Sequence, residues 1–103
     1  HPETDALFTT SDVTAAWACT AFAERGIRVP EQMQVIGFDG IDAAAYLQIS
    51  TIAQPIIQMG QEAVRLLLRL IAQQDIPQQT VLPVQLILRR STRAPVHRQE
   101  ASQ

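Results

Sequence analysis

The sequence contains no lysine and only one cysteine, Cys19. A single cysteine excludes a disulfide within the chain and fits a reducing compartment such as the cytoplasm. The positive charges are all arginines, which are scattered between Arg25 and Arg98, and the net charge is −2. Because DNA and anionic membranes attract clustered positive charge, we expect neither to be a direct partner of these residues.

Aromatic residues are also scarce, at 5% of the chain, whereas 47% of the residues are hydrophobic and 17% are charged. This composition is typical of a soluble globular protein with an aliphatic core. A length of 103 residues suits one small domain or part of a larger one. The chain opens with His1 instead of methionine and shows no signal segment, so we expect a fragment or a processed product.

The sequence offers little to catalysis or metal binding. His1 and His97 lie at opposite ends of the chain, and no Cys, His and acidic residues have the spacing of metal ligands, so we expect no metal and no cofactor. Asp39 and Asp42 are close in sequence, but no neighbouring group would set their pKa values apart as a catalytic pair requires. We therefore expect that the protein is not an enzyme.

Apolar runs and turn residues alternate along the chain. They predict strands at residues 6–9, 35–38, 50–53 and 81–89, and helices at 13–25, 41–47 and 55–73. Ser11 or Asp12 is expected to cap the first helix, Asp42 the second, and Pro55 suits the first turn of the third. This order predicts the α/β class with an open, largely parallel sheet. Residues 94–103 are polar and predict a flexible tail.

The run from Gly26 to Gly40 organises this pattern, because it contains a helix stop, a turn and the buried strand that delivers Asp39. Gly26 can take the left-handed conformation that ends a helix, and Pro30 prevents the helix from resuming. In open α/β sheets, ligands bind just beyond the carboxyl ends of such strands. Asp39 therefore stands where a binding residue is expected, and Gly37 would allow a helix to pack closely on the strand.

The helix expected at residues 13–25 is apolar nearly all the way round, which indicates burial on two sides. The second side would be covered either by a partner subunit or by other parts of the same polypeptide, and the sequence leaves both open. Two long helices also cover a sheet of three or four strands poorly. We therefore expect a segment that is incomplete or intertwined with a partner.

Five segments resemble, in order and spacing, the carboxy-terminal part of the effector-binding domain of lactose-repressor-type (LacI/GalR) transcriptional regulators. They are ALFTTSD at 6–12, GIRVP at 26–30, VIGFD at 35–39, STIAQP at 50–55 and LPVQLILRRST at 82–92. The resemblance implies a fold similar to periplasmic sugar-binding proteins, in which a small effector such as a sugar binds between two lobes. Residues 1–93 would belong to the effector-binding and dimerisation domain, with 55–90 in the amino-terminal lobe.

The resemblance also implies partners. The family binds DNA through an amino-terminal domain that these residues lack, and it forms homodimers. Because the apolar faces of residues 55–90 would need other parts of their lobe, the segment could associate further by domain swapping.

Site residues follow from matching positions. The resemblance implies effector binding by Asp39, Ser11, Gln54 and Phe38, with Ser11 replacing the asparagine often found there and Gly40 replacing a second acidic residue. Asp12 is expected to cap the helix from a position behind the ligand. The dimer surface would include the following residues of the first helix and the region after the central strand: Val13, Ala16, Trp17, Thr20 and Tyr46.

Two other functions share parts of this pattern. A periplasmic sugar-binding protein of a transporter has the same fold, and an upstream signal sequence would favour it over a cytoplasmic repressor. A flavodoxin-like enzyme or response module would need a phosphate-binding glycine loop or a catalytic dyad, which the sequence lacks. Trp17 could stack on a sugar ring, but in mid-helix it fits a core or an interface better.

Overall fold

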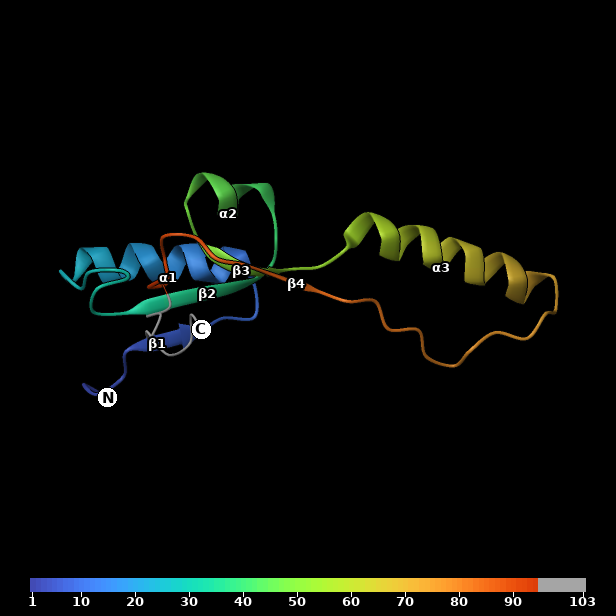
Figure 1. Ribbon diagram of the computed structural model, residues 1–103, viewed down its shortest axis with the longest axis horizontal. Helices are drawn as coiled ribbons and strands as arrows, with labels where there is room; N and C mark the ends of the chain where they lie inside the picture. The colour runs from blue at the N-terminus through green and yellow to red at the C-terminus, as the bar shows by residue number, and fades with distance from the viewer. Residues whose placement is uncertain (95–103) are drawn as a thin grey trace, which may run out of the picture.

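The computed structural model describes residues 1–94 as alternating strands and helices. The elements are β1 (Ala6–Phe8), α1 (Asp12–Glu24), β2 (Gln34–Asp39), α2 (Asp42–Tyr46), β3 (Ser50–Ala53), α3 (Ile56–Ile71) and β4 (Gln85–Ile87) (Figure 1). This order confirms the predicted α/β class. The tail predicted at 94–103 lies, except for its first residue, outside the described residues.

The four strands form one sheet in the order β1-β2-β3-β4. Strands β1, β2 and β3 run parallel, and β4 pairs antiparallel with β3. Strand β4 covers only Gln85–Ile87 and is shorter than the predicted strand at 81–89. The reason is that β3 ends at Ala53, which pairs with Gln85, so residues 81–84 have no strand edge to pair with.

Helix α1 packs on one face of the sheet, where the small core lies. Its fully buried Ala15 lies against the central strand at Gly37. The buried core cluster consists of Ala15, Met33, Val35, Ala44 and Ile49. A Cβ atom on Gly37 would overlap the carboxylate of Asp12 and press on Ala15. Gly37 therefore allows helix and strand to approach closely, which agrees with the interpretation of this glycine from the sequence.

The chain returns to this core after β4 and is held there by Ser91, which is almost fully buried. Its hydroxyl donates a hydrogen bond to the Val35 carbonyl at 2.5 Å and accepts one from the Ser50 amide at 2.8 Å. The Val35 amide in turn donates to the Ser91 carbonyl at 2.9 Å. The return segment is thereby tied to β2 and β3, the two central strands.

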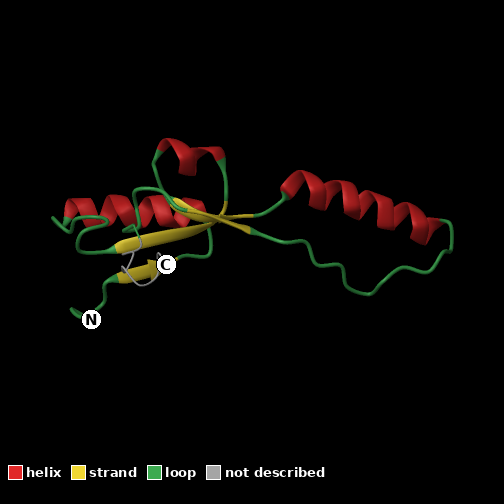
Figure 2. Cartoon of the chain, viewed as in Figure 1, coloured by secondary structure: helices red, strands yellow, loops and turns green. Residues whose placement is uncertain are grey.

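Helix α3 extends away from the sheet, and the chain comes back beside it before β4 (Figures 1 and 2). We call this projecting helix, Ile56–Ile71, the arm. No residue of α3 is buried. The radius of gyration is 18.6 Å, against about 13 Å for a compact chain of this length. The apolar side chains that the arm leaves more than half exposed are Ile56, Ile57, Val64, Leu67, Leu68, Leu70 and Ile71.

The helix caps differ in part from those expected. Ser11 is the N-cap of α1, and its hydroxyl accepts a hydrogen bond from the Thr14 amide at 3.1 Å. Asp12 is instead the first residue of the helix, because its carboxylate is engaged elsewhere. The N-cap of α2 is Ile41, without a side-chain hydrogen bond, and Asp42 lies in the first turn. Pro55 precedes α3 as its N-cap residue.

In residues 1–94, no helix has both the length and the apolar character needed to cross a membrane.

Candidate functional site

The candidate site lies where the three parallel strands end. Because β1, β2 and β3 run in the same direction, their carboxyl ends share one edge of the sheet. Ser11 follows β1, Asp39 ends β2 and Gln54 follows β3. Such an edge is the usual ligand-binding position in open parallel sheets.

Asp39 and Gln54 lie in direct contact at this edge. The Gln54 side-chain amide donates a hydrogen bond to Oδ1 of Asp39 at 2.7 Å. The Gln54 backbone amide also donates to the Asp39 carbonyl, at 3.0 Å. Both residues are half-buried, so their polar groups are ordered yet still reachable. The structure therefore brings together two of the four residues predicted to bind the effector.

The backbone at Asp39 is unusual, since its φ angle is +120° and that of the next residue, Gly40, is +81°. A residue with a Cβ atom rarely adopts positive φ, and such residues cluster at functional sites. Gly40 also needs its missing side chain, because a Cβ atom there would lie 2.6 Å from the Cβ of Ala53. The turn after β2 is thus pressed tightly against β3.

The carboxylate of Asp12 holds this turn through hydrogen bonds. Its Oδ2 atom accepts hydrogen bonds from the Gly40 amide at 2.8 Å and the Ile41 amide at 2.9 Å. Its Oδ1 atom accepts one from the Thr51 hydroxyl at 2.5 Å. The sequence did not reveal this role of Asp12, because serine and aspartate are equally good helix caps. Threonine is common in strands, so Thr51 gave no sign of a bond to Asp12.

The other two predicted residues are oriented differently. The Ser11 hydroxyl lies 3.0 Å from the Thr14 hydroxyl and also caps α1, so its described hydrogen bonds stay within its own helix. Gly37 faces α1, and successive residues of a strand point to opposite faces of the sheet. Phe38, the next residue of β2, therefore lies on the face away from α1. The structure does not join either residue to the pair formed by Asp39 and Gln54.

A groove of about 250 Å³ begins at Gln54 and runs between α3 and the returning chain. Apolar side chains line most of it, including Met59 and Leu66 on the helix and Leu82 and Val84 opposite. Glu62 also lies along this groove, with its carboxylate paired to Arg65. The groove therefore extends the polar edge of the sheet into an apolar channel along the arm.

Hydrogen bonding is the chemistry that this edge offers. The side chains at the strand ends supply a carboxylate, an amide and a hydroxyl, which suit a neutral ligand rich in hydroxyl groups. Among residues 1–94, no three or more His, Cys, Asp or Glu side chains are grouped so as to hold a metal ion. Burial raises the pKa of the Cys19 thiol, which disfavours the reactive thiolate.

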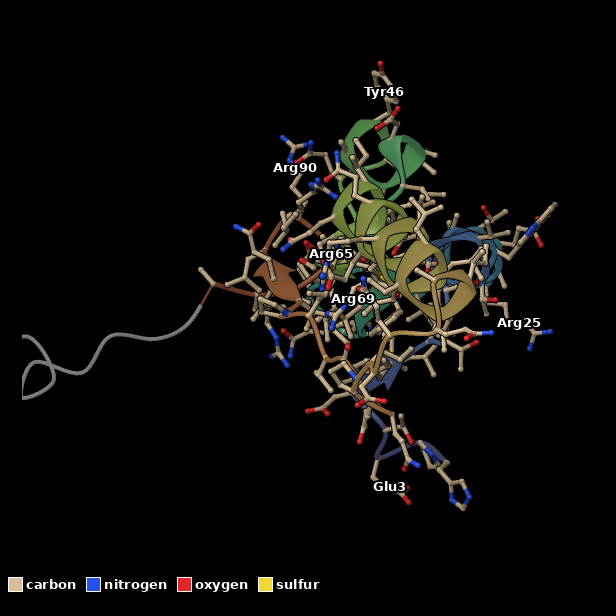
Figure 3. All side chains as sticks on the ribbon, turned by 90° about the vertical axis from the view of Figure 1, so that its right-hand side faces the viewer. Glu3, Arg25, Tyr46, Arg65, Arg69 and Arg90 are labelled. Atoms are coloured by element: carbon tan, nitrogen blue, oxygen red, sulfur yellow. The ribbon has the colours of Figure 1, made fainter. Side chains whose placement is uncertain are left out.

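The predicted dimer surface is exposed in the chain. The outer side of α1 presents Val13, at 55% exposure, and Trp17, at 72%. Tyr46 is 87% exposed and points away from the end of α2 (Figure 3). A hollow of about 300 Å³ between the two helices is lined by Ala16, Trp17, Thr20 and Leu47. Helix α1 is therefore covered on one side only, and its second apolar side is open.

The strain at Asp39 can be measured by comparing two variants. Asp39→Gly should be more stable than Asp39→Ala by about 1 kcal/mol or more, since both lose the bond to Gln54 and only glycine relieves the positive φ. At Gln34, an ordinary position at the start of the same strand, the order should reverse, with alanine favoured by roughly 0.5–1 kcal/mol. Urea unfolding measures both differences. Greater stability of Asp39→Ala over Asp39→Gly would contradict the strain.

Comparison with known proteins places this geometry in a family. Residues 1–92 match the model of the periplasmic binding protein-like domain. The chain is 38% identical over 96 residues to the ribose operon repressor of Bacillus subtilis (strain 168), covering 90% of this chain and 29% of that protein. It is 39% identical over 92 residues to the HTH-type transcriptional repressor CytR of Escherichia coli (strain K12), covering 86% of this chain and 27% of CytR.

Solved structures agree. A LacI family transcriptional regulator from Arthrobacter sp. FB24 in complex with lactose superposes with a TM-score of 0.79 and 39% identity, over 90% of this chain and 36% of that one. The lac repressor dimer bound to operator and the anti-inducer ONPF gives 0.81 and 33%, over 87% and 32%. The chain thus spans about a third of these proteins. It belongs to the periplasmic binding protein-like domain family, in the form that LacI/GalR-type transcriptional regulators use as their effector-binding domain.

Proposed function

We propose that this chain is the effector-sensing and dimerisation part of a DNA-binding transcriptional repressor that responds to a sugar or a similar small molecule. The observation that carries the proposal is the hydrogen bond between Asp39 and Gln54 at the carboxyl edge of the sheet. Asp39 offers acceptor oxygens to ligand hydroxyl groups. Gln54 lies where the chain leaves the sheet for the arm, so the same pair touches both the ligand position and the crossover between lobes.

We also propose the domain boundaries that the resemblance implies. Residues 1–93 form part of the effector-binding domain, and residues 55–90, which include the arm, belong to the amino-terminal lobe, with β4 as the stretch where the returning chain rejoins the sheet beside β3. The effector lies between the lobes, against Asp39 and Gln54, with Ser11 and Phe38 as further contacts. Contact by Ser11 requires its hydroxyl to turn away from Thr14.

A shift of populations supplies the mechanism. An effector hydroxyl that donates to Asp39 competes with the side-chain amide of Gln54 for the same oxygen. Occupancy thereby favours one arrangement of the crossover and of the lobe beyond it. The dimer passes this difference to DNA-binding domains outside these residues, as a coupling of two binding equilibria.

Three observations support a cytoplasmic repressor over a transporter's periplasmic protein or an enzyme. The named relatives are repressors of transcription. The apolar surface on α1 and α2 suits a lasting subunit contact. Hydrogen-bond acceptors and donors meet at the polar edge, as between Asp39 and Gln54, and we propose that they bind a ligand without catalysis and without a cofactor.

The exposed apolar surfaces indicate two kinds of association. We infer that α1 and α2 form the homodimer contact through Val13, Ala16, Trp17, Thr20 and Tyr46. The arm presents a second apolar face around Leu67, which is 54% exposed. In the isolated chain, we infer that two copies exchange arms, so that this face packs on the other copy in a domain-swapped association.

Effector binding can be tested in the full-length protein with D-ribose, lactose and D-xylulose as probes. A sugar that binds should raise the melting temperature, and Asp39→Ala should remove that rise, since losing hydrogen bonds to a charged group costs about 1.5–3 kcal/mol, or roughly 10–100-fold in affinity. Operator binding, measured by fluorescence anisotropy, should persist.

Asp42→Ala is the matched control, because Asp42 is an exposed aspartate on the neighbouring helix. It should leave the thermal stabilisation intact. An undiminished rise with Asp39→Ala would exclude Asp39 from the site, and no rise with any of the three sugars in the parent protein would contradict the proposed ligand class.

Association can be tested by light scattering of the 103-residue chain. We expect a dimer or a larger species instead of an 11.4 kDa monomer. Trp17→Glu should weaken the contact through α1, and Leu67→Glu the contact through the arm, because each buries a charge in an apolar interface. Gln58→Glu, on the polar side of α3, is the control and should change nothing.

A monomeric parent chain would contradict both contacts. Association that survives Leu67→Glu but not Trp17→Glu would rule out exchange of arms while supporting the dimer surface.

A further inference from the structure

The carboxylate of Asp12 is the best-anchored charged group in the described part of the chain. It is 1% exposed and accepts hydrogen bonds from three places, namely the Gly40 amide, the Ile41 amide and the Thr51 hydroxyl. Amide donors at a carboxylate make strong, short hydrogen bonds, and a carboxylate in the first turn of α1 is also favoured by the helix dipole. The buried charge is therefore well compensated.

The surrounding residues leave room for this carboxylate. A side chain at Gly37 would overlap Oδ1 of Asp12. The central strand therefore has no side chain at the point where the carboxylate lies against it. Thr51, fully buried on the next strand, turns its hydroxyl to the same oxygen. Asp12 thus links the start of α1, the turn after β2 and strand β3 at one point.

The turn that Asp12 holds would not keep its shape unaided. Asp39 and Gly40 both have positive φ angles, and the residue with a side chain pays for that conformation in strain. Strained conformations persist when the surroundings over-determine them. Here the two amides that follow Asp39 are both held by one carboxylate oxygen, which restrains the peptide groups on the carboxyl side of Asp39.

We propose that Asp12 is the positioning residue of the ligand site: it sets the direction of the Asp39 carboxylate by holding the Gly40 and Ile41 amides, with Thr51 as its support. This inference rests on the proposed function, because the positioning matters only if Asp39 binds the effector. Asp12 acts through Asp39 and does not touch the ligand itself. Its loss releases the turn and weakens binding, while the core around Ala15 and Val35 stays folded.

Conservative variants separate shape from charge. In Asp12→Asn, the amide oxygen can still accept from Gly40 and Ile41, and the NH₂ group can donate to the Thr51 oxygen. Asp12→Ala removes all three acceptor contacts. Thr51→Val keeps the volume of the threonine and removes only its hydroxyl, so it frees one side of the carboxylate. The three variants should therefore form a series of increasing disturbance, with Asp12→Asn first, then Thr51→Val, then Asp12→Ala.

Residue-resolved amide hydrogen exchange in the full-length protein tests the positioning without any ligand. In Asp12→Ala, the Gly40 and Ile41 amides should exchange about tenfold faster or more, because their acceptor is gone. The Val35 amide, which is bonded to Ser91, should keep its protection. Asp12→Asn should restore most of the protection at the turn, and Asp42→Asn should leave every rate unchanged.

Unchanged exchange at Gly40 and Ile41 in Asp12→Ala would overturn the proposal. Equal loss of protection at Val35 would also overturn it, since Asp12 would then serve the whole fold. If Asp12→Ala does not fold, Thr51→Val decides in its place. The expected result is faster exchange at Gly40 and Ile41 alone. Unchanged exchange at these two amides, or an equal increase at Val35, would be the contrary result.

Calorimetry with D-ribose tests the link to binding. Asp12→Ala should weaken the affinity about tenfold, and adding it to Asp39→Ala should cause little further loss, because one residue acts through the other. Additive losses would contradict that route. If D-ribose does not bind the parent protein, the same titrations are made with lactose and D-xylulose. Binding of none of the three contradicts the proposed ligand class, whereas the exchange rates still decide the role of Asp12.

Discussion

The close approach of α1 to β2 is the contact on which the rest of the structure depends. At Gly37 the strand has no side chain, and the space is taken by Asp12 and Ala15 of the helix. The same approach brings the Asp12 carboxylate within reach of the Gly40 amide and the Thr51 hydroxyl. A single small residue in the central strand therefore permits both the core contact and the network that shapes the polar edge.

The arm shows the opposite situation, in which an element forms without a core. Helix α3 has a broad apolar face and a polar line, where Arg65 and Arg69 lie along one side (Figure 3). Its amphipathic sequence is sufficient to define the helix, yet none of its residues is buried. The chain spans about 29% of the ribose operon repressor that it resembles. The sheet and α1 therefore find a core within these residues, whereas the apolar face of the arm does not.

Much of the fold could be predicted from the sequence because the strands are short apolar runs between clear turn residues. Strand β3 begins and ends at Ser50 and Ala53, as expected. The length of β4 could not be predicted, since alternation continues to Arg89 while the partner strand ends at Ala53. Pairing in a sheet depends on the neighbour, which lies far away in sequence.

The candidate site was predictable in its position and only partly in its contacts. Asp39 ends the central strand as expected, and Gln54 meets it, because parallel strands place their ends at one edge. The exchange of roles between Ser11 and Asp12 was not predictable, since both residue types cap helices equally well. In the structure, the Asp12 carboxylate accepts from the Gly40 amide, whereas the Ser11 hydroxyl accepts from the Thr14 amide at the start of α1. The positive φ of Asp39 was not predicted either, because aspartate tolerates positive φ better than most residues but adopts it in only a small minority of cases.

The most direct measurement of the central claim is a crystal structure of the full-length protein with a sugar that raises its melting temperature. We expect the sugar to lie at the carboxyl edge of the sheet, with a hydroxyl on the Asp39 carboxylate and the Gln54 amide displaced from it. We also expect Asp12 still to hold the Gly40 and Ile41 amides. A sugar bound elsewhere, with the bond between Asp39 and Gln54 intact, would contradict the proposed site.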